Sequence, residues 1–372
     1  MGEISKRVRN NDGRMNLPLL TISARYGWMT QQSRFSASIA GREKKNYTLL
    51  KKHQLSYNHG NSKVAIYGTV YELTDYDEAL VPKVYHSFSL TPENSSKFIE
   101  SYFHTKKLDA QLRKFIASTA RMDGLLNISF DDFMKVKLFA PEQCEQSKIS
   151  RIINLIEKLI TLQQRKLEIL IKLKRSFLTK SMANSLDKNP ELYFNSASVK
   201  WLKQKLSDLT IKEFKGNTKL NDTKPGKTEY LDAERLNGNV PLFIDKPINT
   251  LKSDILILWD GSKAGSVYYG FEGSLGSTLK AIRLNPKLVN SFFVYQQLKS
   301  KQDVIFNKYR TPNIPHVIKN FTKVYPIYFP SMAVQNKIAR FLGNLDTLIE
   351  IQQKSIKDHK VIKKYLLQKL FI

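Results

Sequence analysis

The chain has 372 residues, 41% of them hydrophobic, which is enough to bury two modest cores. Sixty Lys and Arg against 33 Asp and Glu give a net charge of +27, and this excess favours a polyanionic partner, nucleic acid before an anionic membrane. The sequence shows no membrane-spanning apolar run or signal peptide, and one cysteine, Cys144, excludes a disulfide framework or a cysteine-rich zinc site, so we expect a cytoplasmic protein that binds no membrane.

Residues 1–140 indicate a domain of mixed helix and strand. Strands are expected at 54–57 and 64–67, with the loop 58–63 between them, and a helix at 95–115. The loop combines a glycine, small polar side chains and a lysine, so it either meets a phosphate or base edge or is only a tight turn. The candidate DNA-contacting residues of this domain are Asn58, His59, Asn61, Lys63, Arg113 and Arg121.

Residues 141–183 are expected to form one long helix. Pro141 ends an apolar run, and Gln146 and Lys148 follow it at the helix start. The next residues recur in alternating steps of four and three over about four heptads, which is the seam of a coiled coil and needs a partner helix to cover it. The seam positions are Ile149, Ile153, Ile156, Ile160, Gln163, Leu167, Leu170, Lys174 and Phe177.

Residues 184–330 indicate a second domain of the same kind. Strands are expected at 254–259, 265–269 and 279–283, and a helix at 289–299. Arg and Lys read guanine or bind phosphate and Asn reads adenine, whereas the alternative is surface charge without a target. The candidate DNA-contacting residues here are Asp260, Ser262, Lys263, Lys308, Arg310 and Asn313.

The two domains differ at their start. Gly2 of the first domain aligns with Ser207 of the second, which is preceded by a strand-like segment at 199–206. The corresponding segment is missing from the first domain, so we expect its start to be trimmed.

Residues 331–372 repeat the first long helix. Pro330, Gln335 and Lys337 reproduce Pro141, Gln146 and Lys148 with a shift of 189 residues (330 − 141). Polar residues interrupt both seams at matching places, Gln163 with Gln352 and Lys174 with Lys363, and they either fix register and partner or only extend to the coil surface. The second seam contains Ile338, Leu342, Leu345, Ile349, Gln352, Ile356, His359, Lys363, Leu366 and Leu370.

The length of the linker predicts that the two helices are antiparallel. About forty helical residues span roughly 60 Å. A parallel pair would require the linker between Met182 and Val199, of about sixteen residues, to return most of that distance, and it reaches at most ~55 Å when fully stretched. The sequence therefore predicts an α+β protein with a pseudo-twofold internal repeat, in which an antiparallel two-helix coiled coil separates two mixed α/β domains.

These features resemble the specificity subunit of a Type I restriction–modification system. The resemblance rests on the two Pro-x4-Gln-x-Lys-Ile helix openings at 141–149 and 330–338, on the strand and Asp-Gly-Ser-Lys loop at 255–263, and on Ile314-Pro315-His316-Val317. It implies target-recognition domains at 1–140 and 184–330, and spacer helices at 141–183 and 331–372.

The resemblance also implies a function. A specificity subunit has no catalysis and no cofactor of its own, reads a bipartite asymmetric sequence in double-stranded DNA, and docks two methyltransferase subunits on its helices. Restriction motor-nuclease subunits join through the complex, and these partners are expected to use S-adenosylmethionine, ATP and Mg.

Two other readings remain open. The first is a DNA nuclease or an adenine methyltransferase that acts on its own, but only Glu43-Lys44-Lys45 fits a nuclease signature, and neither Asn189-Pro190-Glu191 nor the glycines from 270 to 276 match a methyltransferase motif. The second is a scaffold whose coil binds proteins and whose charge has no DNA target.

Overall fold

The computed structural model describes the chain except residues 36–40, 61, 117–124, 183–199, 312–314 and 372. It divides into two compact units. Unit 1 comprises Met1–Gln164 with Ser355–Ile372, and unit 2 comprises Arg165–Lys354. Each unit therefore contains one mixed domain and a part of both long helices.

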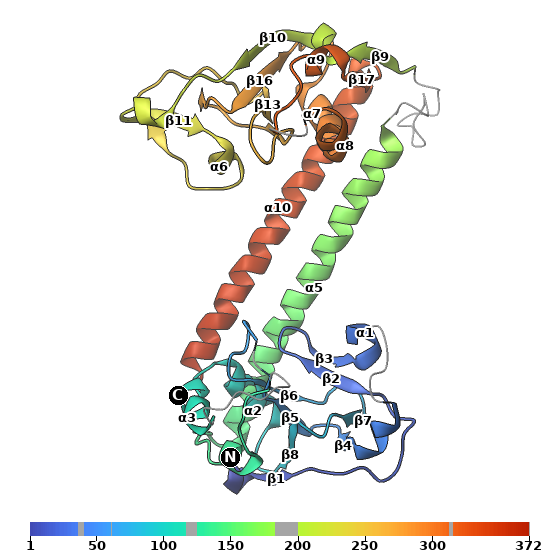
Figure 1. Ribbon diagram of the computed structural model, residues 1–372, viewed down its shortest axis with the longest axis vertical. Helices are drawn as coiled ribbons and strands as arrows, with labels where there is room; N and C mark the ends of the chain where they lie inside the picture. The colour runs from blue at the N-terminus through green and yellow to red at the C-terminus, as the bar shows by residue number, and fades with distance from the viewer. Residues whose placement is uncertain (36–40, 61, 117–124, 183–199, 312–314, 372) are drawn as a thin grey trace. The chain divides into compact units, whose positions relative to one another are not determined.

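Unit 1 is built on a four-stranded antiparallel sheet in the order β1-β8-β5-β6 (Figure 1). Helix α2 contacts the edge strand β6, and two further strand pairs, β2 with β3 and β4 with β7, enclose a separate small core. The strands are β1 Ser5–Arg7, β2 Leu20–Ser23, β3 Gly27–Thr30, β4 Thr48–Lys51, β5 Leu55–Asn58, β6 Thr69–Glu72, β7 Glu78–Val81 and β8 His86–Leu90. The helices are η1 Gly2–Ile4, α1 Gln31–Phe35, η2 Gly41–Asn46, α2 Ser96–His104, α3 Asp109–Phe115 and α4 Phe130–Met134.

Unit 2 repeats this sheet in the order β10-β16-β13-β14, again antiparallel throughout. Its additions differ from those of unit 1: β11 lies between β12 and β15, and β9 pairs with β17. The strands are β9 Leu202–Lys205, β10 Thr210–Lys215, β11 Pro225–Leu231, β12 Phe243–Ile244, β13 Ile255–Leu258, β14 Val267–Tyr269, β15 Ser274–Leu275, β16 Leu279–Leu284 and β17 Pro326–Phe329. The helices are η3 Leu206–Leu209, η4 Leu220–Asp222, α6 Ala233–Leu236, α7 Ser291–Ser300, α8 Gln302–Lys308 and α9 Phe321–Val324.

The shared sheet order confirms the predicted α+β fold with diverged internal repeats. The starts of the two domains are equivalent in the structure as well, because the backbone nitrogen of Met1 donates to Val136 O (2.7 Å) as that of Leu206 donates to Tyr325 O (2.9 Å). The trimmed start of the first domain stays a prediction. The domain limits taken from the resemblance stay a prediction, since the compact units divide both long helices instead.

Two predicted elements of the first domain are wrong. Residues 64–67 form no strand but a turn before β6, with Val64 and Ile66 about half exposed, because Gly68 adopts a φ of +80° that places the strand after it. The predicted helix at 95–115 is broken into α2 and α3, since Lys106 adopts a left-handed φ of +65°. The predicted strands 54–57, 254–259, 265–269 and 279–283 and the helix 289–299 are confirmed within a few residues.

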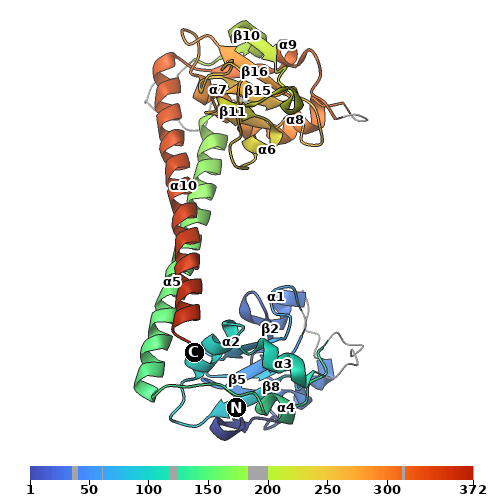
Figure 2. The same cartoon turned by 90° about the vertical axis from the view of Figure 1, so that its left-hand side faces the viewer.

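The two long helices are α5 Gln143–Ser181 and α10 Met332–Lys369. The predicted seam residues are the buried or half-buried positions of both helices, and their neighbours are mostly exposed. In unit 2, Lys174 pairs with Asp346 while the rings of Phe177 and Phe341 lie 4.3 Å apart, so numbers rise along α5 as they fall along α10. The segments of the two helices within this unit therefore run antiparallel, as predicted (Figure 2).

Unit 1 contains the equivalent ion pair. Lys363 lies 2.8 Å from Glu157, and both residues are the 189-residue counterparts of Lys174 and Asp346. The pKa of Glu157 lies below its usual value, because burial raises it but the ammonium groups of Lys97 and Lys363 lower it by more. The seam lysines thus pair with an acid on the opposite helix in both units, which favours the register reading over simple extension into solvent.

The repeated glutamine fixes how each helix begins. Oε1 of Gln146 accepts from Ser95 N (2.9 Å), the N-cap of α2, while Nε2 donates to Pro141 O (2.9 Å). Gln335 makes the same two bonds, to Asn290 N (2.8 Å) and Pro330 O (2.9 Å). Both side chains are almost completely buried. The motif therefore joins the start of each long helix to the start of the helix that covers the sheet.

The far end of each long helix enters a domain core. Met182, just after α5, belongs to the core of unit 2, and Phe371, just after α10, belongs to the core of unit 1. Phe371 is 2% exposed, and its ring lies 5.0 Å from that of Phe98. Each domain is thus completed by the end of a helix whose beginning follows the other domain in the sequence.

Candidate nucleic-acid interface

In unit 2, two of the segments predicted to contact DNA meet at the end of β13. The loop 259–265 leaves this strand and lies against residues 315–318, with Val317 N donating to Trp259 O and Gly261 N donating to Pro315 O, both at 2.9 Å. Side chains join the segments as well, since Nη1 of Arg310 donates to Ser262 O at 3.1 Å. The tertiary structure therefore brings together predicted residues that are about fifty positions apart.

The loop presents polar side chains around a glycine turn. Gly261 adopts a φ of +107°, which an L side chain rarely adopts. Ser262, Lys263 and Lys308 are exposed, and Arg310 is half-buried with its guanidinium 5.7 Å from the Phe306 ring. Asn313 lies outside the described residues.

Asp260 is an acidic residue of this loop, and it is paired with a lysine. Its Oδ2 lies 2.6 Å from Nζ of Lys215, and the Asp260 side chain is 39% exposed. Lys280, on β16, lies 4.0 Å above the Trp259 ring and pairs with Glu213. Lys215 and Lys280 are not among the predicted DNA-contacting residues, because both lie on strands and only the sheet places them beside the loop.

The equivalent loop of unit 1 has the same backbone connection. Leu126 N donates to His59 O at 2.8 Å, as Val317 N does to Trp259 O, and Gly60 pairs with Leu125 as Asp260 pairs with His316. Position 259 therefore corresponds to His59, and position 260 to Gly60.

His59 requires a correction. Its side chain is buried, with Nδ1 2.7 Å from Leu126 O and Nε2 2.8 Å from Val84 O, and its ring stacks 4.8 Å from that of His86. A ring held on both nitrogens by backbone carbonyls positions the loop and does not reach a base edge. The sequence of the loop does not predict this burial, because the groups that contact the His59 ring come from distant positions in the chain.

The other predicted residues of unit 1 lie in several places. The amide of Asn58 bonds within the domain, to Ile22 O at 3.1 Å and from Gly60 N at 3.0 Å. Lys63 is exposed in the loop and Arg113 is exposed on α3, and among the described residues no hydrogen bond or ion pair links Arg113 to the loop. Asn61 and Arg121 lie outside the described residues.

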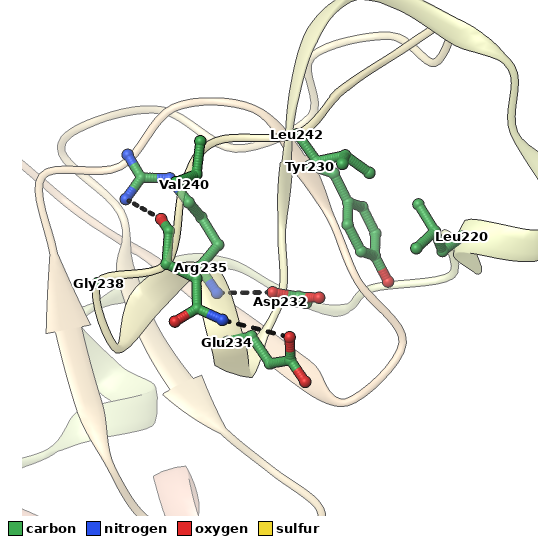
Figure 3. Close-up of a pocket in the computed structure, with 9 residues that line it drawn as sticks. Leu220, Tyr230, Asp232, Glu234, Arg235, Gly238, Val240 and Leu242 are labelled. Atoms are coloured by element: carbon green, nitrogen blue, oxygen red, sulfur yellow. Dashed lines mark hydrogen bonds between the residues drawn. The ribbon is translucent and has the colours of Figure 1, made fainter.

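A separate pocket of about 530 Å³ lies beside α6 in unit 2 (Figure 3). Arg235 N donates to Asp232 Oδ1 at 2.8 Å, and the Arg235 guanidinium pairs with Glu229. The polar groups at this pocket thus bond to one another and hold the turn after α6. None of the predicted DNA-contacting residues lines the pocket.

Two further properties concern the described residues alone. They contain no group of three or more His, Cys, Asp or Glu side chains placed to hold a metal ion. Nor does any of their helices have the length and apolar character that crossing a membrane requires.

Comparison with known proteins finds similarity to subunits of Type I restriction–modification systems. Residues 198–358 match the family model of the Type I restriction modification DNA specificity domain. The chain is 32% identical over 165 residues to the Type I restriction enzyme MjaVIII specificity subunit of Methanocaldococcus jannaschii, and 23% identical over 279 residues to the putative type I restriction enzyme MjaX specificity subunit of the same organism. These matches cover 43% and 69% of this chain, but only 39% and 63% of the two relatives.

Solved structures show the same fold. The S subunit of the Type I restriction–modification system of M. genitalium matches with a TM-score of 0.66 and 18% identity, over 99% of this chain and 93% of that one. A chain from a structure that describes complex assembly and conformational transition of the type I R–M system matches with a TM-score of 0.53 and 12% identity, over 100% of this chain and 96% of that one. The resemblance inferred from the repeated helix openings is therefore confirmed.

Proposed function

From its confirmed resemblance to the specificity subunits of Type I restriction–modification systems, we propose that this chain is the non-catalytic subunit that reads a bipartite asymmetric sequence in double-stranded DNA. The observation that carries this proposal is that two unlike domains share one sheet plan, and that each unit contains segments of both long helices joined by an equivalent ion pair. Two unlike readers joined by a stiff spacer recognise two unlike half-sequences at a fixed separation. The loops differ as this requires, with Asp260 in one domain where the other has Gly60.

The net charge of +27 supplies the attraction to DNA. Phosphate contacts by Lys and Arg release counterions, so we expect affinity for the target to fall by about 10³-fold or more between 50 and 200 mM salt if six or more phosphates are contacted. The exposed Lys263 and Lys308 suit this role beside the loop of unit 2. If the chain instead binds all duplexes equally and weakly at every salt concentration, the result would favour the alternative of a protein scaffold whose charge has no DNA target.

The helices also have a second apolar face that suits partner subunits. In unit 1, Ile152, Leu155, Leu159 and Leu162 on α5 are 37–64% exposed and follow one another in steps of three and four. In unit 2, the equivalent positions on α10 include Leu348 and Ile351, which are 47% and 60% exposed. A heptad stripe left open on a helix is typical of packing against further helices.

These two stripes support the docking of two methyltransferase subunits, one for each copy, with restriction subunits joining through the complex. The partners, and not this chain, would bind S-adenosylmethionine, ATP and Mg. Replacing Leu155 and Leu159 by Glu should weaken assembly with the methyltransferase subunit, measured by analytical ultracentrifugation. Exchanging the exposed Lys158 for Glu on the same helix is the matched control and should assemble normally, and equal assembly of all three proteins would refute this docking face.

The spacer is tested by its length. Inserting one heptad into each helix at equivalent positions adds about 10 Å, or about three base pairs of DNA. We expect the complex with methyltransferase subunits to methylate the same two half-sequences with a longer gap between them. New half-sequences at the old gap would contradict the proposal.

The absence of intrinsic catalysis is tested with the purified chain. Incubated with DNA, magnesium and labelled S-adenosylmethionine, the chain alone should neither cleave nor methylate, and adding methyltransferase subunits should start methylation. Activity of the chain alone would favour the independent nuclease or methyltransferase.

A further inference from the structure

Asp260 is an acidic residue on a basic surface. Lys215, Lys263, Lys280 and Arg310 belong to the strands and segments that meet at this loop, and of these Lys280 is paired with Glu213. A carboxylate that faces DNA is repelled by phosphate, so its presence at the centre of such a surface needs a compensating reason.

The internal repeat shows which part of the loop both domains share and which residue differs between them. The backbone around residue 260 is the same in both domains, as shown by the equivalent bridges of Asp260 with His316 and of Gly60 with Leu125. The first domain forms this connection with a glycine, so the loop does not need a carboxylate to fold. The Asp260 side chain is thus an addition to the scaffold that is specific to the second domain.

The carboxylate is held in place and keeps free acceptor capacity. Lys215 occupies Oδ2 at 2.6 Å, whereas two carboxylate oxygens offer about four lone-pair positions. Asp260 N donates to Thr278 O (3.2 Å), and Gly261 N donates to Pro315 O (2.9 Å), so the backbone at this position is tied to the residue just before β16 and to the segment before Val317. The side chain is therefore oriented before any partner arrives.

We propose that Asp260 reads a cytosine in the half-sequence of the second domain, and that Lys215 is its positioning residue. This inference rests on the proposed function. In the major groove, cytosine presents the N4 amino group, a donor that a carboxylate accepts. Guanine and thymine present acceptors that repel a carboxylate, and adenine places its N7 acceptor beside its N6 donor, so cytosine is the base that suits Asp260 best. Lys215 also offsets the charge of Asp260 next to the phosphates.

The experiment uses the full chain assembled with methyltransferase subunits, bound to a pool of randomised duplexes that are then sequenced. Wild type should enrich one cytosine in the half-sequence of the second domain. Asp260→Asn should lose that preference by about 5- to 150-fold and favour a base that presents an acceptor, with every other position unchanged. Asp260→Glu should keep cytosine with lower affinity, and Asp222→Asn, an exposed aspartate on η4, should behave as wild type.

The positioning role needs its own variants. Lys215→Gln should reduce discrimination at the same position without changing the preferred base, and Lys215→Arg should restore it. If Lys215→Gln instead changes the preferred base, or leaves discrimination as in wild type, the positioning role is wrong.

Three results would overturn the reading of cytosine. The first is an Asp260→Asn complex that enriches the wild-type sequence, and the second is a folded one that loses preference at every position, since Asp260 would then hold the loop as a whole. In both cases the bipartite target of wild type still stands. The third is a wild-type complex that enriches no bipartite sequence, and that result alone refutes the proposed function as well.

Discussion

The buried glutamine at the start of α10 permits a quantitative test of how the repeat holds its domains. Replacing Gln335 by Ala removes the bond accepted from Asn290 N and the bond donated to Pro330 O, so both backbone groups lose these partners at a position where the native side chain is fully buried. Each unsatisfied group costs about 1–3 kcal/mol, so we expect the two groups to cost unit 2 about 2–6 kcal/mol, and the cavity adds to this. For a unit of this size, that corresponds to a fall in Tm of about 4–24 °C.

Calorimetry and urea unfolding measure this loss. Gln335→Glu should be at least as destabilising as Gln335→Ala, because it buries a charge and sets an oxygen against Pro330 O. Gln146→Ala tests the same bonds in unit 1, and Gln353→Ala, an exposed position on α10, should change stability by less than about 0.5 kcal/mol. The reasoning is refuted if Gln335→Ala and Gln353→Ala unfold alike.

Three further predictions concern unit 1. In a double-mutant cycle of Lys363→Met with Glu157→Gln, we expect a coupling of about 1 kcal/mol, since both side chains are under 30% exposed, and a coupling of zero would show that the seam lysine only extends into solvent. Burial lowers the pKa of His104 to about 4, below the usual 6.5, so the unfolded state binds more protons between these values and stability falls as the pH drops through them. By this count wild type should lose about 2 kcal/mol relative to His104→Gln between pH 7 and pH 5 in urea unfolding, and a constant difference between the two would contradict it. Phe371→Ala should cost about 3–5 kcal/mol by calorimetry, whereas Tyr365→Ala, 57% exposed, should cost little, and similar losses for both would mean that the end of α10 does not complete the core.

Backbone conformation and burial in the first domain explain why some local predictions failed. The strand expected at 64–67 and the unbroken helix expected at 95–115 were both contradicted by left-handed backbone positions, at Gly68 and at Lys106. A lysine in that conformation is uncommon and carries no sequence signature. His59 looked like a loop residue, yet packing against His86 and two carbonyls buries its ring.

The sequence by itself determined the repeat, the seams and the antiparallel direction of the helices. These features follow from the spacing of apolar residues and from the length of the linker, and both can be read directly along the sequence. The matching of Lys174 with Lys363 was also visible, although the acids that pair with them were not.

Only the tertiary structure decided which residues share a surface. Asp260 and Lys215 are 45 positions apart, and Ser262 and Arg310 are 48 apart, so each pair meets only because the sheet and the segment before Val317 bring them together. Such contacts depend on strand order and register, which the hydrophobic pattern of single strands does not specify. The physical reason is that a seam repeats along one helix, whereas a binding surface collects side chains from several elements at one point in space.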